Sequence, residues 1–173
     1  MGKNRIQQKI EIMATKDFTT SILVDQTPAE VFNAVINVRG WWSEEIEGGT
    51  NKVNDEFTYH FEDVHRCKMK LTEVVPNKKV VWLVLSNYFK FTKDAGEWTG
   101  NKIIFEINKK GNQTQLQFTQ VGLTSEYECY TVCQGAWTTY IQKSLHDLIT
   151  TGKGHPNGKD KAQTEDEKKF IEK

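Results

Sequence analysis

Apolar and polar residues alternate over two long stretches in the middle of the chain. The first stretch runs from Asp55 to Val75 and the second from Ile103 to Phe118. A period of two is typical of strands that bury one face, so both stretches predict antiparallel strands. Turn residues interrupt each stretch, Asp63-Val64 in the first and Gly111-Asn112 in the second, and predict a hairpin at each place.

Two further segments complete the predicted sheet. Phe18 to Val24 is the first strand, and Lys79 to Leu85 follows the turn dipeptide Pro76-Asn77. The second segment is apolar at both parities, as expected for a strand that is covered on both faces or that carries a bulge. Which parity faces inward stays open. The pattern predicts six or seven strands.

Two segments have helical spacing instead. Thr27 to Glu30 has the form of a capping box with Pro28 in the first turn, and predicts a short amphipathic helix that ends near Gly40. Ser125 to Glu128 also has this form and is followed by apolar residues at helical spacing, which predicts a long helix from Glu126 to Thr151 that packs on the sheet. These apolar residues are Cys129, Val132, Cys133, Ala136, Trp137, Tyr140, Ile141, Leu145, Leu148 and Ile149.

Composition narrows the class of protein. Lys plus Arg and Asp plus Glu both total 23, so no basic excess points to nucleic acid or to an anionic membrane, and neither is expected as a partner. The longest apolar run, Val80 to Leu85, is far shorter than the roughly 20 residues of a membrane span, and Met1 to Ile12 lacks the apolar centre of a signal peptide. Three cysteines without such a signal fit a reducing compartment, so a cytoplasmic protein is expected.

The chain divides into three parts by composition. Residues 1–16 are expected to be a loosely held N-terminal extension, residues 17–152 the folded domain, and residues 153–173 a charged C-terminal tail. The tail carries many lysines and acidic residues and one large aromatic residue, Phe170. We expect it to be mobile or marginally helical and to add little to stability.

No catalytic residue, cofactor or metal is assigned from the sequence. His60, Glu62, Asp63, His65 and Cys67 are types that zinc accepts, but strand parity places His60 and Cys67 on opposite faces, so they would not converge on one ion. Gly152-Lys153-Gly154 follows a helix, which favours a helix C-cap over a phosphate loop. No Gly-x-Ser-x-Gly motif is present.

Aromatic residues concentrate on the predicted inner face of the sheet and on the long helix. Large rings that cannot interdigitate fully leave a pocket, so these residues predict either a plain core or the wall of a cavity. The candidate ligand-binding residues are Trp42, Phe57, Tyr59, Phe61, Met69, Trp82, Phe105, Phe118, Cys133, Trp137 and Tyr140.

Short motifs spread over about residues 17 to 152 suggest a family. They are Thr27-Pro28-Ala29-Glu30-Val31-Phe32, Trp41-Trp42, Trp98-Thr99-Gly100 ahead of the strand Lys102 to Asn108, Gly122-Leu123, Gly135-Ala136-Trp137 and Ser144-Leu145. Together they resemble the homologues of the activator of the heat-shock-protein-ninety ATPase, within the START-related, birch-pollen-allergen-like (SRPBCC) helix-grip superfamily. The resemblance implies an α+β helix-grip fold: a curved antiparallel sheet around a long C-terminal helix, with a hydrophobic cavity between them.

Three functions are compatible with this resemblance. The leading hypothesis is binding of an apolar or aromatic small molecule in the cavity, without covalent chemistry. The second is an enzyme of the same superfamily, a cyclase or hydrolase, in which Tyr59 or Tyr140 orients the substrate and transfers protons. The third is a module that contacts a heat-shock chaperone through an outer surface. The eukaryotic co-chaperone of the family has a separate N-terminal domain for much of that contact, and no counterpart is expected within these 173 residues.

Overall fold

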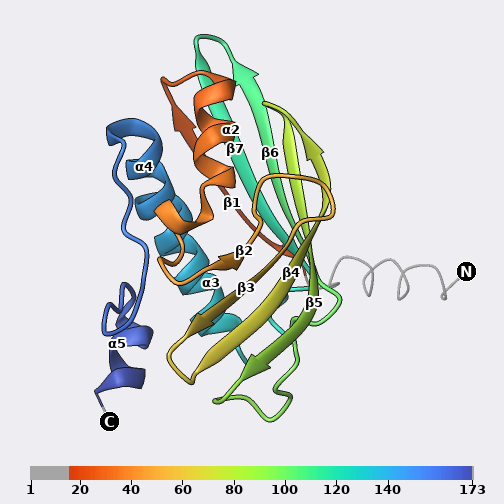
Figure 1. The fold of residues 1–173 in the computed structure, drawn as a ribbon, viewed down its shortest axis with the longest axis vertical. Coiled ribbons are helices and arrows are strands. Elements are labelled where there is room, and N and C mark those ends of the chain that lie inside the picture. The colour runs from red at the N-terminus through yellow and green to blue at the C-terminus, as the bar shows by residue number, and fades with distance from the viewer. Residues whose placement is uncertain (1–15, 173) are drawn as a thin grey trace, which may run out of the picture.

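The fold is one antiparallel sheet that curls around a helical layer (Figure 1). The computed structural model describes residues 16–172. Its strands pair in the order β1-β7-β6-β5-β4-β3-β2. The strands are β1 Phe18–Val24, β2 Glu47–Gly48, β3 Glu56–Phe61, β4 His65–Val75, β5 Lys79–Phe89, β6 Lys102–Lys110 and β7 Gln113–Val121. The helical elements are α2 Pro28–Ile36, the 3₁₀ turn η1 Val38–Gly40, α3 Tyr130–Thr139, the π-helical segment η2 Tyr140–Leu145, α4 His146–Thr151 and α5 Glu165–Ile171.

The predicted hairpins are confirmed. β3 pairs with β4 so that Phe57 lies opposite Met69, and β6 pairs with β7 so that Phe105 lies opposite Phe118. β1 closes the far edge by pairing with β7. The sheet therefore has seven antiparallel strands, within the six or seven that the alternating pattern predicts, and it curves as the family resemblance implies (Figure 1).

The parity of β5 is resolved by its packing. Val80, Trp82 and Val84 belong to the core, while Val81 is buried apart from it. The register between β4 and β5 shifts between Lys68 and Met69 and again between Leu71 and Glu73, so this pair of strands is bulged.

Helix α2 begins as the sequence predicts. The Glu30 backbone N–H donates to Thr27 Oγ1 at 3.2 Å, and Thr27 N–H donates to Glu30 Oε2 at 2.8 Å, which completes the capping box. α2 lies on the same side of the sheet as the C-terminal helix (Figure 1).

The start of the long C-terminal helix was predicted wrongly. The helix begins at Tyr130 rather than Glu126, because the Glu128 carboxylate does not return to Ser125 but accepts hydrogen bonds from the backbone N–H groups of Lys93 and Asp94. At the helix start, the backbone N–H groups of Glu128 and Cys129 donate to the carboxylate of Glu97, at 2.8 and 3.0 Å. A carboxylate from the loop after β5 thus replaces the local cap.

The same helix continues to Thr151 through the π-helical segment η2. The wider turn places Tyr140, Ile141, Ser144 and Leu145 toward the core, and all four are buried. The helix ends at Gly152, whose φ of 84° is the left-handed conformation of a C-cap, so the helix-cap interpretation of the glycines there is confirmed.

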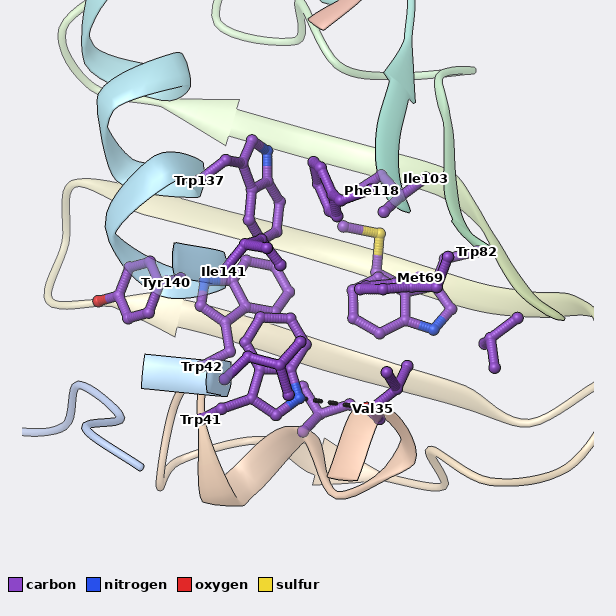
Figure 2. Packing of buried hydrophobic residues seen from close by; sticks show 14 of the residues in the cluster. Val35, Trp41, Trp42, Met69, Trp82, Ile103, Phe118, Trp137, Tyr140 and Ile141 are labelled. Carbon is purple, nitrogen blue, oxygen red and sulfur yellow. Dashed lines mark hydrogen bonds between the residues drawn. The ribbon is translucent and has the colours of Figure 1, made fainter. Parts of the chain in front are cut away.

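A dense cluster of aromatic rings fills the space between the sheet and the helices (Figure 2). The ring of Trp82 stacks on those of Trp41 and Trp42, with centroids 6.2 and 5.9 Å apart. The indole N–H of Trp41 donates to the carbonyl of Val35 at 3.1 Å and fixes this stack to α2. Close packing of large rings in this way is typical of a protein interior.

The C-terminal segment differs from the mobile tail that its charge predicts. After Gly152 the chain returns along the domain, and Asn157 forms a parallel bridge with Ser43. Helix α5 follows, opened by a second capping box between Thr164 and Glu167. The ring of Phe170 stacks on that of Phe91 at 5.0 Å and 28°, so α5 is docked on the domain.

Between residues 16 and 172 no helix is both long enough and apolar enough to cross a membrane.

Candidate functional site

An apolar cavity of about 50 Å³ lies between β3, β4, the end of β5 and the C-terminal helix. Helix α5 supplies one of its walls. Its lining residues are Trp42, Tyr59, Phe61, Val64, His65, Phe89, Phe91, Trp98, Val132, Cys133, Ala136, Trp137, Tyr140, Thr164, Glu167 and Phe170. About 10–15 Å³ holds one water, so the cavity is larger than a single water site.

Hydrogen-bonding groups gather at one end of the cavity. The hydroxyl of Tyr140 donates to the carboxylate of Glu167, at 2.9 Å to Oε1 and 2.8 Å to Oε2. Asn157 Nδ2 donates to the hydroxyls of Tyr59 and Tyr140 at 2.9 and 2.8 Å. The other amide atom, Asn157 Oδ1, is buried and has no partner within the described residues. Figure 2 shows the Tyr140 oxygen pointing away from the tryptophan cluster.

The carboxylate of Glu167 is buried but well supplied with donors. Its Oε1 accepts from the backbone N–H groups of Gln163 and Thr164 at 2.8 and 3.1 Å. Burial raises the pKa of Glu167, and these hydrogen bonds, which favour the charged form, reduce the rise. Within residues 16–172 no basic side chain forms a salt bridge with Glu167. Burial also raises the pKa of Tyr59 and of Tyr140, so both phenols are neutral donors at physiological pH.

His65 lies on the cavity wall as a neutral base. Burial lowers the pKa of His65 to about 4, against a smaller opposing effect of its hydrogen bond to Asn87. His65 Nε2 lies 2.8 Å from Asn87 Oδ1, while Asn87 Nδ2 donates to the carbonyl of Ala95 at 3.4 Å. Since Oδ1 is the acceptor, this network assigns the proton to Nε2 and leaves a lone pair on Nδ1.

Two further observations limit the chemistry of the site. Burial raises the pKa of the Cys133 thiol, so this residue contributes an apolar, unreactive wall. Among residues 16–172, no three His, Cys, Asp or Glu side chains are grouped as a metal ion would require.

Comparisons with known proteins give a fold but no sequence family. No family model matches the chain, and no curated protein does. Aha1 from Colwellia psychrerythraea, solved as a dimer in solution, is 23% identical, with 80% of this chain and 99% of that chain covered and a TM-score of 0.65. CalU16 from Micromonospora echinospora is 11% identical, with 81% and 68% covered and a TM-score of 0.58. EF2215 from Enterococcus faecalis, a conserved protein of unknown function, is 15% identical, with 99% and 96% covered and a TM-score of 0.54.

This chain has the helix-grip fold. The resemblance noted from its motifs is thereby confirmed at the level of the fold, and the observed sheet and C-terminal helix agree with it. In this helix-grip fold the cavity occupies only one end of the space between sheet and helix.

The position of the cavity separates the predicted candidate residues into two groups. Those that line it are Trp42, Tyr59, Phe61, Cys133, Trp137 and Tyr140. Those that do not are Phe57, Met69, Trp82, Phe105 and Phe118, which are buried in the filled core beside Trp41 and α2. Strand parity identifies the inward face of the helix-grip sheet, but it does not show where along that face packing stops.

Sequence reasoning also missed several lining residues. His65 has the same parity as Cys67 and Met69, so the alternation alone could have placed it inside. Glu167 and Phe170 were overlooked because they lie in a charged segment, although Thr164 and Glu167 have capping-box spacing.

Proposed function

We propose that this protein binds a small apolar or aromatic molecule in the cavity between the sheet and the C-terminal helix. The observation that carries the proposal is an aromatic cavity beside a buried aromatic cluster, with a short helix as one wall. Trp42, Trp98 and Trp137 supply flat apolar surfaces, and Tyr59 and Tyr140 add polar groups at one end. A mostly apolar pocket with a few convergent polar groups is the usual form of a small-molecule site.

The size of the cavity requires one wall to move. A volume of about 50 Å³ is well below the roughly 300–1,000 Å³ of most ligand sites. Helix α5 is the wall best suited to movement, because it has seven residues and so short a helix has little stability of its own. Its apolar anchor on the domain is the contact of Phe170 with Phe91.

A fluorescence titration tests the proposal. N-phenyl-1-naphthylamine is neutral, apolar and brighter in apolar surroundings, and it should bind saturably and quench tryptophan emission. Ala136→Phe adds a ring to a residue that lines the cavity and should abolish the binding. Thr138→Phe is the matched control, since Thr138 is exposed on the same helix and does not line the cavity. Binding that survives Ala136→Phe unchanged would place the probe elsewhere and refute the proposal.

Acid–base catalysis on a bound molecule is the second candidate, and His65 is the observation that favours it. A neutral imidazole on the cavity wall, whose Nδ1 has no hydrogen-bond partner among residues 16–172, has the form of a general base. Mass spectrometry of small molecules extracted from purified protein separates the two functions. If the protein is an enzyme with His65 as its base, the His65→Gln variant should retain unchanged substrate. The molecule extracted from the variant should then differ in mass from the one extracted from the unaltered chain. A binding protein should yield the same molecule from both chains.

A further inference from the structure

Helix α5 places a carboxylate and an aromatic ring in the cavity, as a ligand would. Glu167 and Phe170 are three residues apart and therefore lie on the same face of the helix. Both line the cavity, with the carboxylate against Tyr140 and the ring against Phe91. The remaining volume of about 50 Å³ is thus what is left after α5 has filled part of the site.

The Glu167 carboxylate accepts from the backbone N–H groups of Gln163 and Thr164 at the start of its own helix, and also from side chains of other parts of the fold. These side chains are Tyr140, at 2.8 Å, and Asn157, whose Nδ2 lies 3.5 Å from Oε2 and also donates to Tyr59. Tyr59 lies on β3, Tyr140 on η2, and Asn157 on the connection before α5. Asn157 is held independently of α5, because its N–H donates to the carbonyl of Trp42 and its own carbonyl accepts from Glu44 N–H, each at 2.9 Å. These three polar groups would therefore remain in place if α5 moved.

Among residues 16–172 these groups have hydrogen-bonding capacity that is not used: the Tyr59 proton has no acceptor and Asn157 Oδ1 has no donor. Tyr140 donates its proton to Glu167, and its oxygen accepts from Asn157. The oxygen of Tyr59 also accepts from Asn157, whereas its proton has no acceptor within residues 16–172. Tyr59 is 3% exposed, so its hydroxyl is a buried donor beside the carboxylate.

We propose that the preferred ligand is an aromatic carboxylate that displaces α5, with its carboxylate bound by Tyr59, Tyr140 and Asn157 and its ring among the aromatic side chains of the cavity. This inference rests on the proposed function and specifies the ligand of that site. The ligand would take over the contacts that Glu167 makes with Tyr140 and that Phe170 makes with Phe91 in this structure.

The chemistry of the site argues against other polar groups. Asn157 Oδ1 could accept a hydrogen bond from an ammonium group, but Tyr59, Tyr140 and Asn157 carry no negative charge, so the buried positive charge would be uncompensated once Glu167 is displaced. A phosphate or sulfate keeps its charge, and no basic side chain within the described residues pairs with Glu167 to balance such a charge. A carboxyl group suits a buried site of neutral donors because it can take up a proton, and burial raises the pKa of Glu167 itself.

Calorimetric titration with two probes of the same shape tests the inference. One is 2-naphthoate, and the other is 2-isopropylnaphthalene, in which methyl groups replace the carboxylate oxygens. Full-length Glu167→Ala lacks the competing carboxylate, so 2-naphthoate should bind it about tenfold or more tightly than the unaltered chain. Adding Tyr140→Phe should weaken 2-naphthoate binding about tenfold, because the hydrogen bond from the Tyr140 hydroxyl to the ligand's carboxyl group is lost, and should change the affinity for the hydrocarbon less than about twofold.

The outcomes separate this inference from the proposed function. If the hydrocarbon binds as tightly as 2-naphthoate, or if Tyr140→Phe weakens both equally, the carboxylate preference is refuted while the apolar site stands. If neither probe binds, both proposals fail. Phe170→Ala is a second way to release α5, and it removes no polar group. If Glu167→Ala does not fold, the affinities for 2-naphthoate and 2-isopropylnaphthalene are compared in Phe170→Ala, with and without Tyr140→Phe.

Discussion

The hydrogen bond between Trp137 and Gln120 fixes the C-terminal helix to the sheet, and its contribution can be measured. Trp137 Nε1 donates to Gln120 Oε1 at 2.7 Å, and the two residues are 1% and 0% exposed. Trp137→Phe keeps an aromatic ring beside Trp42 and Phe118 but leaves the Gln120 oxygen without a donor. An unpaired buried acceptor costs about 1–3 kcal/mol, in addition to the loss of ring atoms.

The matched control is Trp82→Phe. Trp82 is 0% exposed and its indole N–H has no partner within the described residues, so this substitution removes the same ring atoms but no hydrogen bond. We expect Trp137→Phe to lower the free energy of unfolding by about 1–3 kcal/mol more than Trp82→Phe does. Urea denaturation followed by far-ultraviolet circular dichroism gives both values without relying on tryptophan emission. A cost for Trp137→Phe no larger than that of Trp82→Phe would refute this reasoning.

Three further predictions concern stability. The pKa of His65 is about 4 in the folded protein, below the ordinary 6.5, so the free energy of unfolding should fall by on the order of 3 kcal/mol as the pH is lowered from 6.5 toward 4. Urea midpoints measured over a pH series should show this fall in the unaltered protein and not in His65→Gln. Glu97→Ala removes the acceptor for the start of the long helix and should cost about 0.5–2 kcal/mol by urea denaturation, whereas the exposed Glu126→Ala should change little. Phe170→Ala should lower the melting temperature by several degrees, more than Ile171→Ala, whose side chain is 38% exposed.

Each of these has a contrary result. A pH profile unchanged by His65→Gln would mean that the pKa of the half-buried ring is not lowered as described. Equal effects of Glu97→Ala and Glu126→Ala would mean that the long-range cap is not formed. A melting temperature unaffected by Phe170→Ala would mean that the C-terminal segment is the mobile tail that its composition suggests.

The fold could be predicted because its signals are local. Alternation of period two defines β3, β4, β6 and β7, and turn residues define the hairpins that join them. The cap of α2 is equally local, since Thr27 and Glu30 are three residues apart. In each case the interacting residues are neighbours in sequence or across a tight turn.

The start of the long helix could not be predicted because its cap is distant. Ser125 and Glu128 have the spacing of a capping box, but Glu97 lies 31 residues before Glu128 and accepts its N–H. The carboxylate of Glu97, on the loop after β5, thus accepts the hydrogen bonds at the helix start in place of the local Ser125–Glu128 motif.

The site was predicted in part for a similar reason. The parity of Tyr59 and Phe61 and the helical stripe of Trp137 and Tyr140 identify side chains that face inward. They do not show that Phe105 packs solidly at one end while a cavity remains at the other. That division depends on α2 and α5, which cover the two ends and whose positions no local pattern encodes.

The indole N–H signals of the five tryptophans test the central claim most directly. Trp42, Trp98 and Trp137 line the cavity, whereas Trp41 and Trp82 are buried in the filled core. In nitrogen–proton correlation spectra recorded during titration with 2-naphthoate, the first three signals should shift saturably and more than the other two. Shifts confined to Trp41 and Trp82, or no saturable shift at any of the five, would contradict binding in this cavity.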